Sequence, residues 1–270
     1  MRFDRDRAHR LRDQSLNRLI PNMLTIIALC AGLTAVHFGL QGNWERAIIA
    51  IVVAGILDGL DGRIARLLNG SSKFGAELDS LSDFVSFGVA PALLLYYWTL
   101  QDLRGLGWVL ALVFAVCCAL RLARFNTRID NTDLPAWTGK FFTGVPAPAG
   151  AGLAITPMIA TFQFGPGYVD QPAVAGAVVL AVSLLMVSQV PTFSFKRIRV
   201  PHHNVVPALL VVALLAALLV SLPWITLLLV GVAYIGSIPF SISSYGKLSR
   251  QRPTAIVTDE TDESHNTPAL

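Results

Sequence analysis

Long apolar segments, each near the length that crosses a bilayer, alternate with short polar segments along most of the chain. A helix needs about 20 apolar residues to span the hydrocarbon core. Glycine, proline, tryptophan and charged residues separate the segments, as expected at span ends. The predicted spans are residues 19–40, 44–69, 74–100, 106–126, 146–163, 172–190, 204–220 and 223–242. The pattern predicts an all-α fold, a polytopic membrane helical bundle with about eight transmembrane helices.

Polar segments flank the predicted transmembrane domain, residues 19–245. Residues 1–18 carry six arginines among polar neighbours and predict a basic cytoplasmic arm. The apolar run from Leu19 is longer than the core of a cleavable signal peptide, and further spans follow it. Residues 246–270 contain the acidic run TDETDES, lack apolar periodicity and predict a disordered cytoplasmic tail.

The positive charges predict how the spans are oriented. Cytoplasmic loops of membrane proteins are enriched in lysine and arginine. With eight spans and the N-terminus inside, only Arg46 and Arg104 of the 21 lysines and arginines fall on the outer side. The sequence therefore predicts an N-in/C-in protein of the inner (cytoplasmic) membrane.

Composition narrows the class of protein. Hydrophobic residues make up 54% of the chain and charged residues 14%, whereas soluble proteins are about 25% charged. The net charge of +4 is too small and too scattered to indicate nucleic acid as a partner, and it suits a face toward anionic membrane lipids. Cys30, Cys117 and Cys118 lie in apolar runs, without the spacing of a metal site or a disulfide framework.

Four aspartates stand out because they lie inside or at the edge of the second and third predicted spans. A carboxylate at the centre of a span costs about 2.5–3.5 kcal/mol on insertion scales. Asp58 and Asp61 are three residues apart and Asp79 and Asp83 four apart, so each pair shares a helix face. A short turn joins the two spans, which must then be antiparallel neighbours. We expect all four carboxylates to converge near the cytoplasmic end of this hairpin.

Four clustered carboxylates need cations, and ligands that are all oxygen suit Mg²⁺ or Mn²⁺. Two divalent ions would balance the four negative charges. Gly59, Gly62 and Gly75 leave room for a ligand to approach, and Arg66 could grip a phosphate with its guanidinium fork. These features indicate metal-assisted phosphoryl chemistry, with a purely structural polar network between helices as the alternative.

The spacing of these residues is that of a known motif, D-x2-D-G-x2-A-R-x8-G-x3-D-x3-D. The matching positions are Asp58, Asp61, Gly62, Ala65, Arg66, Gly75, Asp79 and Asp83. With every spacing intact, the chain resembles the CDP-alcohol phosphatidyltransferase family. The resemblance implies that an alcohol attacks the β-phosphate of a CDP-linked lipid and releases CMP, and it also implies a homodimer.

The resemblance further implies a role for each motif residue. Asp58 and Asp79 would bridge two metal ions, and Asp61 would bind one of them. Asp83 would be both a ligand of the second ion and the catalytic proton acceptor. The implied contacts to the CDP-lipid are Asn22, Thr25, Gly62, Arg66, Ser72 and Gly75.

The acceptor alcohol follows from three further stretches, residues 78–92, 120–126 and 142–149, which resemble the branch of the family that uses L-serine. The implied reaction joins CDP-diacylglycerol and L-serine into phosphatidylserine. The serine carboxylate needs a cation, for which Arg121 or Arg124 is our candidate; the alternative is that both bind lipid headgroups or follow the positive-inside rule.

Other functions remain as alternatives. Within the family, the acceptor could be glycerol 3-phosphate, inositol or choline. A divalent-cation transporter would also place acids in its spans, but it should distribute them along a pathway or between repeated halves.

Overall fold

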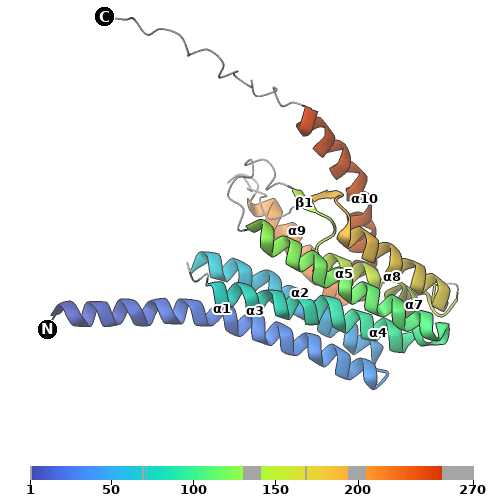
Figure 1. Ribbon diagram of the computed structural model, residues 1–270, viewed down its shortest axis with the longest axis horizontal. Coiled ribbons are helices and arrows are strands. Elements are labelled where there is room, and N and C mark those ends of the chain that lie inside the picture. Colours follow the sequence, from blue (N-terminus) through green and yellow to red (C-terminus); the bar gives the residue numbers. More distant parts are fainter. Residues whose placement is uncertain are drawn as a thin grey trace, which may run out of the picture.

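The apolar segments fold into helices that pack side by side, as the computed structural model shows (Figure 1). It describes residues 2–68, 70, 72–129, 141–167, 169–193 and 205–250. The first half contains α1 (Arg2–Leu40), α2 (Trp44–Leu67), α3 (Lys73–Asp83), η1 (Phe84–Val89), α4 (Ala90–Trp98), η2 (Leu100–Leu103) and α5 (Gly105–Ile129). The second half contains β1 (Phe141–Thr143), α6 (Ala147–Ala154), α7 (Thr156–Phe164), α8 (Pro172–Val187), β2 (Pro191–Phe193), α9 (Val205–Ser221) and α10 (Pro223–Arg250).

Four segments are long and apolar enough to cross a bilayer by themselves, within the part of the chain that the structure describes. They are Leu19–Leu40, Lys73–Trp98, Gly105–Thr127 and Pro223–Ile242. The helices Pro172–Val187 and Val205–Ser221 are apolar but shorter. The helical membrane-protein architecture is thus confirmed, whereas the count of eight spans and the N-in/C-in orientation stay predictions.

Two of the expected spans differ in detail from a plain apolar helix. Helix α2 is continuous over 24 residues, and its second half carries the acidic and basic residues of the motif, Asp58, Asp61 and Arg66. The span expected at 146–163 is divided into α6 and α7 at Ile155, with Pro157 in the first turn of α7. A proline at that position lacks an N–H group to continue the preceding helix, which accounts for the break.

Helices α1 and α2 form an antiparallel hairpin. Its turn contains Gly42 at φ 72°, in the left-handed region that favours glycine. Alanines fill much of the contact, including Ala28, Ala35 and Ala54. Small side chains let two helices approach closely, so α2 is held firmly against α1 along its length (Figure 1).

The third span contains a π-helical segment between two α-helices. Helix α3 continues without interruption into the π-helical η1 and then into α4. A Cβ atom on Gly32 of α1 would collide with the hydroxyl oxygen of Ser86 in η1, so the two segments are in close contact there. The π-helix starts directly after Asp83, and such turns are frequent at functional sites.

The remaining helices complete the bundle on the other side of α5. Helix α5 packs against α8, and α10 packs against α6 and α7. Buried side chains such as Phe87, Phe114 and Met158 fill the centre. The outer faces expose leucine, valine and isoleucine, which suits a hydrocarbon solvent.

The structure adds two features at the edges of the bundle. Strands β1 and β2 pair antiparallel, with Phe141 opposite Phe193, and the helical pattern gave no sign of them. The basic arm at residues 2–18 continues α1 as helix and projects beyond the bundle (Figure 1). Most of the predicted tail, residues 251–270, lies outside the described residues.

Candidate active site

The hairpin of α2 and α3 brings acidic residues together as the motif spacing predicts. One carboxylate oxygen from each of Asp58, Asp61 and Asp79 lies within 4.8 Å of the other two. Asp61 is only 3% exposed, and the other two are partly buried. Three carboxylates at this spacing form a site that could hold a divalent cation, and their oxygen ligands fit a hard metal ion.

Asp83 adjoins this group one turn further along α3. It is not part of the set of mutually close oxygens, but a side-chain hydrogen bond joins it to Asp58. Asp79 also acts on it electrostatically. The structure therefore places all four aspartates in one site, with Asp83 at the side nearer the middle of the third span.

Helix α1 forms the third wall of the site. The Thr25 hydroxyl donates a hydrogen bond to Oδ2 of Asp61 at 2.6 Å, and both side chains are buried. The Ser82 hydroxyl donates to the backbone carbonyl of Thr25 at 3.2 Å. Thr25 of α1 is thus hydrogen-bonded to both α2 and α3.

The start of α3 gathers three of the residues expected to contact the CDP-lipid. Ser72 caps the helix, because its hydroxyl accepts from the backbone N–H of Gly75 at 3.0 Å. A Cβ atom on Gly75 would lie 2.8 Å from Oδ1 of Asn22. A larger residue than glycine would therefore collide with Asn22 and close this corner. The first turn of a helix carries unpaired N–H groups that suit phosphate.

Gly62 and Arg66 lie together on the last turns of α2. A Cβ atom on Gly62 would lie 3.7 Å from Nη1 of Arg66. The Arg66 side chain is exposed, so its guanidinium is open to a ligand from outside the bundle.

The two arginines proposed for the serine carboxylate have different surroundings. Arg121 is 9% exposed, lies over the ring of Phe125 at 5.7 Å, and is within electrostatic reach of Asp83. Arg124 instead donates from Nη1 to the carbonyl oxygen of Val187 at 2.8 Å, at the end of α8. Arg121 therefore faces the acidic site, whereas Arg124 satisfies a carbonyl that the helix end leaves without an intrahelical partner.

Two further polar contacts near the site escaped the sequence analysis. Asn126 of α5 donates to the Ser80 hydroxyl at 2.9 Å and so ties α5 to α3. Tyr234 of α10 lies within electrostatic reach of Arg121. Asn126 could have been found from the sequence, because it is the last residue of the stretch 120–126 that carries the resemblance. Tyr234 could not, because a single tyrosine in an apolar span is no sign of a functional site.

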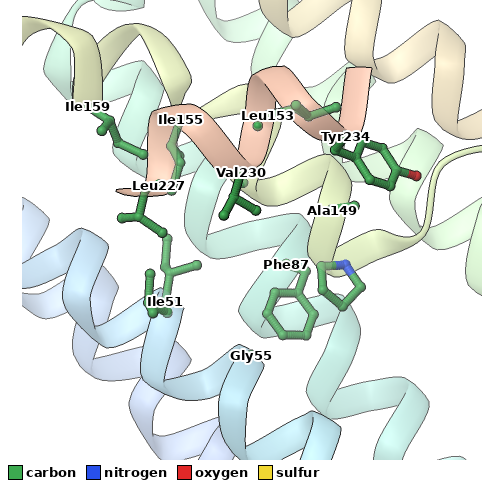
Figure 2. Close-up of a pocket in the computed structure, with 14 residues that line it drawn as sticks. Ile51, Gly55, Phe87, Ala149, Leu153, Ile155, Ile159, Leu227, Val230 and Tyr234 are labelled. Carbon is green, nitrogen blue, oxygen red and sulfur yellow. The ribbon is translucent and has the colours of Figure 1, made fainter. Parts of the chain in front are cut away.

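An apolar cavity of about 210 Å³ lies next to the acids, between α2, η1, α6 and α10 (Figure 2). Gly55 and Phe87 line it. Gly55 comes one helical turn before Asp58, and Phe87 one turn after Asp83. Tyr234 stands at its edge (Figure 2). The cavity is thus lined in part by the same helical segments that carry the carboxylates.

Known proteins are similar to this chain in sequence. The sequence model described as CDP-alcohol phosphatidyltransferase matches residues 18–242. A CDP-diacylglycerol–serine O-phosphatidyltransferase of Mycobacterium leprae is 40% identical over 225 residues, covering 83% of this chain and 75% of that protein. The Mycobacterium tuberculosis protein with the same name is 41% identical, covering 84% and 79%. That of Bacillus subtilis is 37% identical, covering 66% and 92%.

Proposed function

The chain belongs to the CDP-alcohol phosphatidyltransferase family, and from this membership we propose that it transfers the phosphatidyl group of CDP-diacylglycerol to L-serine. The products are phosphatidylserine and CMP. The observation that carries the proposal is the cluster of Asp58, Asp61 and Asp79 beside an apolar cavity. The serine acceptor rests on the names of the relatives that match most of this chain.

The carboxylates supply the metal-binding part of the mechanism. We propose that the cluster and Asp83 hold two divalent cations, Mg²⁺ or Mn²⁺. When bound, such ions would neutralise the pyrophosphate and stabilise the negative charge on the departing CMP. Arg66 adds a cation at the exposed rim, where it can orient a phosphate through two parallel hydrogen bonds.

Asp83 is the residue that we assign to proton transfer. It takes the proton of the serine hydroxyl while the serine oxygen forms a bond to the lipid-side phosphorus. The bond between that phosphorus and the bridging oxygen of CMP breaks, and CMP carries away the electron pair. Its place beside the mutually close oxygens of the cluster, of which it is not a member, supports this division of labour.

The substrate-binding residues surround this centre. Ser72 and Gly75 at the start of α3, with Asn22 of α1 beside them and Gly62 of α2, suit the CDP part of the lipid. The apolar lining of the cavity suits part of an acyl chain, because a hydrocarbon chain placed there contacts apolar side chains and leaves no polar atom unsatisfied. Arg121 suits the serine carboxylate, since it is buried and faces Asp83.

The acceptor is tested by incubating the purified protein with CDP-diacylglycerol, Mn²⁺ and separately labelled serine, glycerol 3-phosphate, inositol and choline. We expect the label to enter lipid from serine alone, and EDTA to abolish release of CMP. Labelling from another alcohol would move the chain to another branch of the family. Full activity in EDTA would contradict the metal role.

Replacing the proposed proton acceptor separates catalysis from metal binding. We expect Asp83→Asn to lower kcat by about 10²–10⁴-fold, because general-base catalysis typically contributes that much. At least one Mn²⁺ should still bind, since Asp58, Asp61 and Asp79 remain. A variant with near-normal turnover that still binds Mn²⁺ would show that another group takes the proton.

The two arginines provide a matched pair for the serine site. Arg121→Lys keeps the charge but loses the planar fork, so we expect a higher KM for serine with little change in the KM for CDP-diacylglycerol. Arg124→Lys should lower thermal stability and leave the KM for serine unchanged, because Arg124 bonds the end of α8. A serine-specific effect in the Arg124 variant alone would reverse the assignment.

We further propose eight spans with both ends in the cytoplasm of the inner membrane, a transmembrane domain at 19–245 flanked by the arm 1–18 and the tail 246–270, and a homodimer. The distribution of basic residues supports the orientation.

Single-cysteine variants test the proposed orientation in a chain whose native cysteines are replaced by alanine. An impermeant maleimide should label Gln41→Cys in intact cells, but Lys73→Cys only after lysis. Labelling of Lys73→Cys in intact cells would refute the orientation.

A further inference from the structure

The hydroxyl of Thr25 is hydrogen-bonded to a residue of the acidic cluster. It has one proton to donate and two acceptors nearby, Oδ2 of Asp61 at 2.6 Å and the carbonyl of Pro21 at 3.1 Å. The distance to Asp61 is the shorter of the two, and a hydrogen bond to an ionised carboxylate is about twice as strong as one to a neutral acceptor. The proton therefore goes to Asp61.

The surroundings of this pair leave it little freedom. Thr25 is 4% exposed and Asp61 3%. The backbone of Thr25 is itself bonded by Ser82 of α3, the helix that contributes Asp79. A rigid hydroxyl that holds one oxygen of a carboxylate restricts rotation of that carboxylate. It thereby keeps Asp61 facing Asp58 and Asp79.

On this geometry, and resting on the metal site of the proposed function, we propose that Thr25 is a positioning residue of the metal centre. Its hydroxyl orients Asp61 for metal binding, and its contribution is to the affinity for the cation rather than to direct recognition of the nucleotide. The same helix contains a natural comparison: Thr34 donates its hydroxyl to the carbonyl of Cys30 at 2.6 Å and is exposed.

The experiment measures Mn²⁺ binding to the full chain in detergent without substrate, by following free Mn²⁺ with electron paramagnetic resonance during a titration. Thr25→Val keeps the shape of the side chain and removes the hydroxyl. We expect its Kd for Mn²⁺ to rise about 10–100-fold, the usual cost of losing a group that orients a metal ligand. Thr25→Ser should restore binding, and Thr34→Val should bind as the wild type does.

Two results would overturn the proposal. One is wild-type Mn²⁺ affinity in folded Thr25→Val, or in Thr25→Ala if the valine variant does not fold. The other is an increase in the KM for CDP-diacylglycerol at saturating Mn²⁺ with unchanged Mn²⁺ binding, which marks a direct substrate contact. The measurement also separates a failure of this proposal from a failure of the proposed function. If the wild-type chain bound no Mn²⁺, the metal centre itself would be refuted; if only the Thr25 variants bound Mn²⁺ as the wild type does, the positioning role alone would be refuted.

Discussion

Mutual repulsion among four carboxylates in a largely apolar hairpin is the constraint around which this fold is arranged. Asp58, Asp61, Asp79 and Asp83 are drawn together by two antiparallel helices, although each would be more stable in water. Close packing of α1 on both helices holds them in place. The small side chains of the α1–α2 contact and the hydroxyls of Thr25, Ser82 and Ser86 make this packing possible.

The central cluster could be predicted from sequence because helix geometry is local. Spacings of three and four residues place side chains on one face, and the short turn makes α2 and α3 neighbours. Helical content followed from the apolar runs for the same reason. The break at Ile155 has a local cause, Pro157 in the first turn of α7, whereas no local pattern indicates the π-helix after Asp83, which could not be predicted.

Contacts between distant segments escaped the sequence analysis for a different reason. Thr25 and Asp61 are 36 residues apart, and Arg124 and Val187 63 apart. No periodicity connects such pairs, because their meeting depends on how whole helices pack. The family resemblance singled out both Thr25 and Asp61 but not the hydrogen bond between them. It also gave no reason to prefer Arg121 over Arg124, which the structure places in different surroundings.

In the proposed reaction, the different chemical character of the carboxylate cluster and of the apolar cavity would also separate the two products. CMP would leave from the polar region at the ends of α2 and α3. The lipid product would keep its acyl chains on the apolar side, where the cavity is lined by hydrocarbon side chains. A water-soluble product and a lipid product would thus leave one reaction centre in different directions.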